Sequence, residues 1–230
     1  MRRYKFLVLS GFLFLSHGTF AVDLSTTKQQ YSYTMGIQVG QMLRAQDSGA
    51  LDIDAFSAAI ADYLGDKPIQ LSQEKMRAAL KYHYENMQSE RNKLAKENLT
   101  RGAEFREENA KRHGVTTLEN GLQYEVLEPG DGASPQKEDR VEVHYKGALI
   151  DGSVFDSSHT REKPAQFNLN RVVPGFREAI TRMKPGAKWR VVMPPTLAYG
   201  EGGTGKKIGP NETLIFEIEY IGLVTTPLAK

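Results

Sequence analysis

Hydrophobic and polar residues alternate with a period of two through much of the last half of the chain, most clearly from Val141. Apolar residues occupy every second position from there to Tyr145, which is typical of a half-buried antiparallel strand with Tyr145 on the core side. Asp151-Gly152 follows as a hairpin turn signal, and a short second run at 153–155 comes after it. The pattern therefore predicts a β-hairpin in this half.

Three further alternating runs, over 122–126, 188–193 and 214–220, predict more strands of the same kind. One short helix is predicted between them, because Phe176 and Ile180 share helical spacing with the apolar residues around them. A single helix against an antiparallel sheet makes an α+β domain, and this is the fold class that we expect.

The first half of the chain has helical spacing instead. Two short helices are predicted over 34–43 and 52–64, with Asp52 or Asp54 as the N-cap of the second. Residues 72–113 contain no proline and one glycine, so they predict a single long helix.

The second half of that long helix is rich in charge and poor in apolar residues. Pairs of opposite charge four residues apart, such as Glu108 and Arg112, would stabilise an exposed helix. A solvent-exposed stalk and one strand of a coiled coil both fit this composition. The stalk is favoured because no sustained heptad repeat is present.

The two short helices and the start of the long one provide only about 50 residues, fewer than a single core comfortably needs. A paired, intertwined homodimer would supply the missing burial. Gly36 and Gly40 have the GxxxG spacing that lets two backbones approach closely, although two tolerated glycines explain the spacing equally well.

The first 21 residues have the pattern of a secretory signal peptide. Three basic residues precede an apolar run from Phe6 to Leu15, and Thr19 and Ala21 are small residues at the positions that a signal peptidase reads. An uncleaved membrane anchor is the alternative, but the run is short for a spanning helix. We therefore expect an exported protein, located in the periplasm, associated with the outer membrane, at the cell surface or secreted.

Composition removes several classes of chemistry. The chain has no cysteine, which excludes disulfides, zinc–thiolate sites and thiol nucleophiles. Without residues 1–21 it has 27 basic and 28 acidic residues, so nothing indicates nucleic-acid binding. The glycine-rich segment 200–205 precedes a strand rather than a helix, so we interpret it as a mobile loop beside a pocket and not as a phosphate loop. No metal and no cofactor are expected.

Five motifs follow one another in the last half of the chain. They are VEVHYKGALIDGSVFDSS at 141–158, Phe167, VVPGF at 172–176, AYG at 198–200 and IGPNETLIF at 208–216. This ordered set resembles the FKBP-type peptidyl-prolyl cis-trans isomerases, and the helical front half is similar to their Mip-like branch (macrophage infectivity potentiator type). The resemblance implies a curved antiparallel sheet wrapped on one short helix, with an apolar proline pocket between them.

Four segments are expected on this basis: a signal peptide at 1–21, a helical dimerisation domain at 22–70, a long linker helix at 71–114 and an isomerase domain at 115–226. The implied partners are prolyl peptides, unfolded proteins, macrolide inhibitors of the FK506 and rapamycin type, and a second copy of the chain. Assisted folding of exported proteins is the expected role. A dimeric chaperone or host-interaction protein, whose pocket mainly docks clients, is the alternative.

The resemblance also implies which residues form the pocket. The catalytic set is Tyr145, Phe155, Asp156, Val173, Phe176, Tyr199 and Phe216. The substrate-binding set is Phe167, Val172, Ile208 and Arg161. Ordinary core packing is the competing interpretation of the aromatic residues, and for Phe167 it is the favoured one. Arg161 is expected to pair with the Asp156 carboxylate.

No nucleophile is needed for such a reaction, because rotation about an X–Pro bond breaks no bond and costs about 18–20 kcal/mol in lost amide resonance. The resemblance implies that the Val173 N–H anchors a substrate carbonyl, that the Tyr199 hydroxyl donates a second hydrogen bond and that Phe176 forms the floor. Family members commonly have Trp at the floor position, and some have an aromatic residue where this chain has Ala165. The single tryptophan, Trp189, is expected to pack away from the pocket.

Overall fold

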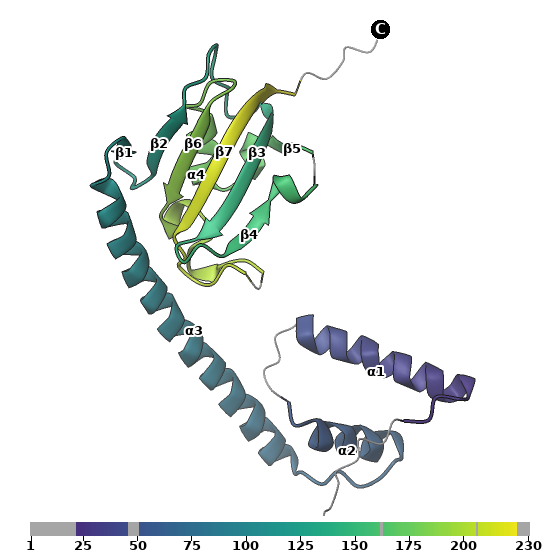
Figure 1. Cartoon of the computed structure of the whole chain (residues 1–230). Helices are drawn as coiled ribbons and strands as arrows, with labels where there is room; N and C mark the ends of the chain where they lie inside the picture. The colour runs from purple at the N-terminus through teal and green to yellow at the C-terminus, as the bar shows by residue number, and fades with distance from the viewer. Residues whose placement is uncertain (1–21, 46–50, 162, 206, 225–230) are drawn as a thin grey trace, which may run out of the picture. The chain divides into compact units, whose positions relative to one another are not determined.

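The computed structural model describes residues 22–45, 51–161, 163–205 and 207–224 (Figure 1). The chain divides into two compact units between Ser72 and Gln73. The predicted signal peptide at 1–21 lies outside the described residues. Within the described residues, no helix combines the length and the apolar character that crossing a membrane requires.

The first unit contains α1 (Thr27–Ala45) and α2 (Ile53–Leu64). Helix α1 begins seven residues before the predicted start because Thr26 and Gln29 form a capping box. The backbone N–H of Thr26 donates to Gln29 Oε1 at 2.9 Å, and that of Gln29 donates to Thr26 Oγ1 at 3.3 Å. Asp52 is the N-cap of α2, where its carboxylate accepts from the Ala55 N–H at 2.9 Å.

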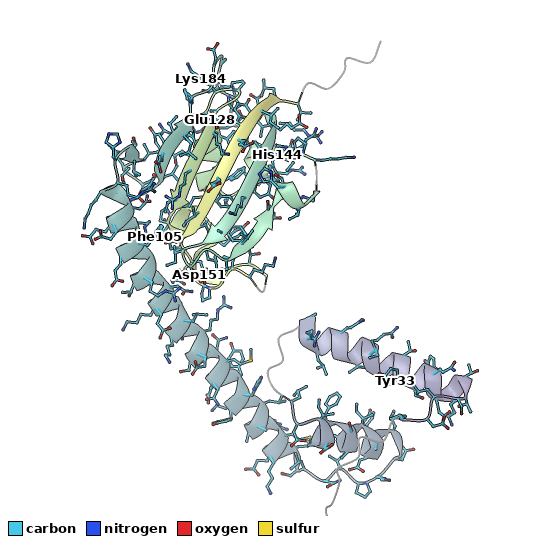
Figure 2. All side chains as sticks on the ribbon, viewed as in Figure 1. Tyr33, Phe105, Glu128, His144, Asp151 and Lys184 are labelled. Atoms are coloured by element: carbon cyan, nitrogen blue, oxygen red, sulfur yellow. The ribbon has the colours of Figure 1, made fainter. Side chains whose placement is uncertain are left out.

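The side chains of this unit are unusually exposed. None of the residues of α1 and α2 is buried. Large apolar side chains stand in water instead: Tyr33, labelled in Figure 2, is 54 % exposed and Leu64 is 77 % exposed. Within the described residues of this unit, the apolar stripes of these helices are therefore not enclosed in a core.

The second unit begins with the long helix α3 (Gln73–Ala110), as predicted. The expectation of a stalk is wrong for the second half of this helix, which packs on the sheet and the loops beside it. Asn98, Gly102 and Asn109 are buried there. Arg112, just beyond the helix end, binds Glu125 at 2.8 Å rather than Glu108. The contacts are polar, which is why apolar periodicity does not reveal them.

Seven strands of the described chain form one antiparallel sheet in the order β1-β2-β6-β7-β3-β4, with β5 paired to β3. The strands are β1 (Val115–Thr117), β2 (Gln123–Glu128), β3 (Arg140–Leu149), β4 (Val154–Ser157), β5 (Ala165–Asn168), β6 (Lys188–Met193) and β7 (Leu214–Leu223). Four 3₁₀ turns lie between them: η1 (Ser158–Arg161), η2 (Leu169–Arg171), η3 (Pro195–Leu197) and η4 (Gly200–Gly202).

The helix α4 (Pro174–Ile180) lies against one face of this sheet (Figure 1). The residues on its buried side are Phe176, Ala179 and Ile180. They pack with the inward-facing residues of the strands in one hydrophobic core. Alternation along β3 is as predicted, with Val141, Val143 and Tyr145 buried. The α+β class and the wrapping of the sheet on one short helix are therefore confirmed.

Candidate functional site

A cavity of about 510 Å³ opens between α4, the inward face of β3 and β7, and the loop that follows β6. Ten of the eleven predicted site residues line it: Tyr145, Phe155, Asp156, Phe167, Val172, Val173, Phe176, Tyr199, Ile208 and Phe216. Arg161 does not line the cavity but contacts two residues that do. Their roles in binding and catalysis remain predictions.

Aromatic rings form the floor and walls of this cavity. Phe176 follows Pro174, the first residue of α4, and is only 4 % exposed. Its ring lies 5.3 Å from that of Phe216 and 5.8 Å from that of Phe167, both edge to face. The site is therefore apolar and preorganised before any ligand enters.

One glycine makes this arrangement possible. A Cβ on Gly147 of β3 would lie 2.5 Å from the Phe155 ring and 2.9 Å from the Phe216 ring. The two rings lie edge to face at 5.5 Å because β3 carries no side chain there. Gly147 stands inside the first motif, but nothing in one sequence distinguishes it from other glycines.

A polar network closes the rim of the cavity beside Tyr145. The Tyr145 hydroxyl donates a short hydrogen bond to Asp156 Oδ2. Arg161 donates to Asp156 Oδ1 at 3.1 Å, as expected, and also to Tyr145 Oη at 2.8 Å. Each of the three side chains therefore binds the other two.

These contacts set the charges at the rim. Burial raises the pKa of Tyr145 to about 12, and its hydrogen bond to Asp156 acts in the same direction. Burial alone would raise the pKa of Asp156, but the hydrogen bonds from Tyr145 and Arg161 outweigh it, so this pKa lies below its ordinary value. Tyr145 is therefore neutral and Asp156 ionised near neutral pH.

Several hydrogen-bond donors on the cavity wall have no acceptor among the described residues, including one backbone donor and one hydroxyl donor. One is the backbone N–H of Val173, at the N-cap of α4, and the other is the hydroxyl of Tyr199, which is 39 % exposed. Both belong to the predicted set. They are available to a ligand whose carbonyl groups accept hydrogen bonds.

Four lining residues are missing from the predicted set. They are Arg171, Thr204, Gly205 and Lys207. The Lys207 ammonium donates to the Phe155 carbonyl at 3.1 Å and so joins two walls of the cavity. In a sequence, polar and glycine residues at the rim of a cavity look the same as those of any surface loop. The segment 200–205 is nevertheless predicted to lie beside the pocket, and Thr204 and Gly205 do line it. Ala165 packs against the core and does not line the cavity.

Two histidines on and after the strands of the sheet lie outside the cavity. His144, labelled in Figure 2, stacks on His159 with ring centroids 4.9 Å apart. Neither histidine lines the cavity. In the described part of the chain, no three His, Cys, Asp or Glu side chains are grouped so that they could hold a metal ion.

An aromatic cavity between an antiparallel sheet and one short helix is the arrangement expected of an FKBP-type prolyl isomerase. The family described as FKBP-type peptidyl-prolyl cis-trans isomerase matches residues 132–221. The domain described as amino terminal to FKBP-type peptidyl-prolyl isomerase matches residues 28–126. The chain belongs to the family of FKBP-type peptidyl-prolyl cis-trans isomerases.

Named relatives agree over most of the chain. The FKBP-type 22 kDa peptidyl-prolyl cis-trans isomerase of Escherichia coli (strain K12) is 43 % identical over 86 % of this chain and 97 % of its own length. The outer membrane protein MIP of Legionella longbeachae is 38 % identical, with 89 % of each chain covered. The crystal structure of FkpA from Escherichia coli has a TM-score of 0.62 and 36 % identity, covering 86 % of this chain and 97 % of that one.

Proposed function

We propose that this isomerase rotates X–Pro bonds of exported protein substrates in the aromatic cavity and so assists their folding. The observation that carries the proposal is that the Val173 N–H and the Tyr199 hydroxyl lie on the wall of a cavity floored by Phe176 and have no acceptor among the described residues.

Each element of the cavity has a role in lowering the barrier. A proline ring seated on Phe176 places the amide in a site that excludes water. The planar amide is charge-separated, whereas the twisted amide has a smaller dipole, so an apolar site favours the twisted form. The Val173 N–H holds a substrate carbonyl and the Tyr199 hydroxyl donates a second hydrogen bond. Every 1.4 kcal/mol gained in this way is about tenfold in rate.

Proton transfer has no part in this mechanism. Asp156 stays ionised through its bonds to Tyr145 and Arg161, and Tyr145 stays protonated to about pH 12. The rim network therefore acts as a rigid edge for the Tyr145 ring. Macrolides of the FK506 and rapamycin type, which present carbonyl groups on an apolar ring, suit the same cavity and donors.

Export is part of the proposal. It is supported by the charged, apolar and small residues of segment 1–21 and by the name of the Legionella relative, an outer membrane protein. We assign 1–21 to a signal peptide, 22–70 to a helical dimerisation domain, 71–114 to a linker helix and 115–226 to the isomerase domain.

A homodimer formed through residues 22 to about 90 completes the proposal. Support comes from the exposed apolar side chains of that segment, such as Ile37, Ile60, Leu80 and Met87. Their transfer from water would gain about 25 cal/mol for each Å² that a second copy covers.

The test is a prolyl-peptide isomerisation assay on the full chain. Tyr199→Phe removes one hydrogen bond, expected to be worth roughly 0.5–1.5 kcal/mol, so the rate should fall by up to about tenfold. Asp156→Leu should also reduce the rate. Tyr220→Phe is the matched control, because the Tyr220 hydroxyl is buried in the core without a partner among the described residues. Full activity of the Tyr199→Phe/Asp156→Leu double variant would contradict the assignment.

A further inference from the structure

One wall of the cavity is a loop that begins at Tyr199, directly after β6 and η3, and runs to β7. Tyr199, Thr204, Gly205, Lys207 and Ile208 line the cavity from this loop. Backbone hydrogen bonds close this loop on itself: the Thr204 N–H donates to the Ile208 carbonyl at 2.9 Å, and the Asn211 N–H donates to the Gly200 carbonyl at 2.8 Å. The next contacts come from far away in the sequence.

The helix α3 holds the other side of this loop. The Arg91 guanidinium donates to the carbonyls of Glu201 at 3.1 Å and Gly202 at 2.8 Å, both in the turn η4 that follows Tyr199. Asn98 Nδ2 donates to the Pro210 carbonyl at 2.9 Å. In return, Asn211 Nδ2 approaches the Ala95 carbonyl at 3.4 Å. The loop therefore lies between the cavity and one stripe of α3.

This contact is close and specific. Asn98 is 1 % exposed. A Cβ on Gly102, one turn further along α3, would lie 3.2 Å from Thr213 Cβ and closer still to its hydroxyl, so a glycine is needed for the approach. The Arg106 side chain also donates to the Thr213 hydroxyl. Thr213, directly before β7, is therefore bound to α3 in the same way as the loop.

The loop needs external support because of its composition. Gly200, Gly202, Gly203 and Gly205 lie within six residues, and glycine loses more backbone freedom on ordering than other residues do. A loop that only partly populates its binding-competent form lowers apparent affinity by that fraction. A guanidinium bound to two carbonyls is a fixed, charge-assisted clamp.

We infer that Arg91 and Asn98 of α3 are positioning residues for isomerisation, which act through the loop that carries Tyr199 and Ile208. The helix is then a functional part of the isomerase unit and not only a connection. The inference rests on the proposed use of the cavity, and its test separates the two.

Arg91 is the residue to change, because it is exposed and its loss leaves no buried group unpaired. In the full chain, Arg91→Ala should lower kcat/KM for a short prolyl peptide and weaken rapamycin binding by about three- to tenfold, with an unchanged Tm. Arg91→Lys, which keeps a donor, should recover much of the loss. Arg77→Ala is the control, since Arg77 bonds to Gln73 of its own helix and should behave as wild type.

A double-variant comparison shows through which wall Arg91 acts. Combined with Tyr199→Phe, Arg91→Ala should cost less than the sum of the two single changes, because both act on the same loop. Combined with Asp156→Asn, whose side chain bonds to Tyr145 and Arg161 and not to this loop, the costs should add. If Arg91→Ala and Arg77→Ala have equal effects while Tyr199→Phe reduces the rate, the role of Arg91 is contradicted but the cavity assignment is not. An unreduced rate for Tyr199→Phe would count against the cavity assignment instead.

Discussion

The two units of this chain use apolar residues in opposite ways. In the sheet unit the inward side chains are fully enclosed, with Ile180 and Ile218 at 0 % exposure. In the first unit the apolar residues of α2 also recur at helical spacing, yet Ile60 is 41 % exposed and Tyr63 is 75 % exposed. A periodic pattern therefore predicts an element and its apolar face, but not whether that face is covered from the same chain. The covered unit contains the cavity, and we propose that a second copy covers the other.

The same substitution in the two units tests this contrast with the largest expected effect. Ile180→Asp places a charge in the core without a partner, which should cost more than about 4 kcal/mol and unfold the sheet unit. Ile60→Asp, in the first unit, should leave the folding of the sheet unit unchanged and instead prevent self-association. Circular dichroism melting and sedimentation at micromolar concentration give the two measurements.

A monomeric wild-type chain in that sedimentation experiment would contradict the proposed dimer. A folded Ile180→Asp variant would contradict the position of the core.

The second test concerns the floor of the cavity. Trp189 is 7 % exposed and stacks on Tyr124 with centroids 4.4 Å apart, and it does not line the cavity. A macrolide should therefore barely change its emission. Phe176→Trp should acquire a strong, saturable response and keep activity, at a cost of about 1–3 kcal/mol in stability if the larger ring overpacks the floor. A large response of the wild type would place Trp189 beside the ligand and remove the floor role from Phe176.

The smallest expected effects concern pH. The folded pKa of Asp156 lies below its ordinary value, so its ionised form stabilises the fold above about pH 4, and this contribution is lost as the pH falls through the folded value. The raised pKa of Tyr145, about 12 against an ordinary 10.0, contributes stability that is complete below about pH 10 and lost between pH 10 and 12.

Between pH 5.5 and 9 neither group titrates, so kcat/KM should be flat over that range. Unfolding by urea at pH 3 and pH 6 should show a smaller difference for Asp156→Asn than for the wild type. A bell-shaped rate profile centred near pH 7 would contradict a mechanism without proton transfer.

The cavity could be predicted from the sequence because its residues come in dense motifs and its chemistry is apolar. Tyr145 and Phe216 lie on neighbouring strands whose alternation is readable, and Phe176 starts a helix marked by Pro174. The pattern does not predict how the aromatic rings fit together. Gly147 is needed because a side chain there would clash with two rings that meet only in the folded chain.

The docking of α3 on the sheet is not predictable from the sequence, for a different reason. Asn98, Gly102 and Asn109 lie on one stripe at helical spacing, but they are polar or small, so apolar periodicity does not reveal them. Helix spacing predicts Glu108 as the partner of Arg112, whereas in the structure Arg112 binds Glu125 of β2. Partners from distant segments decide such contacts.

We propose that catalysis does not depend on association of two chains, and one measurement tests this directly. The rate constant kcat/KM for a short prolyl peptide, expressed per chain, is compared between the wild type and Ile60→Asp over concentrations at which sedimentation shows the wild type associated and the variant monomeric. We predict equal values within about twofold, since the cavity and its α3 clamp lie within one chain. A loss of activity that follows dissociation would contradict the claim and place part of the active site in the partner.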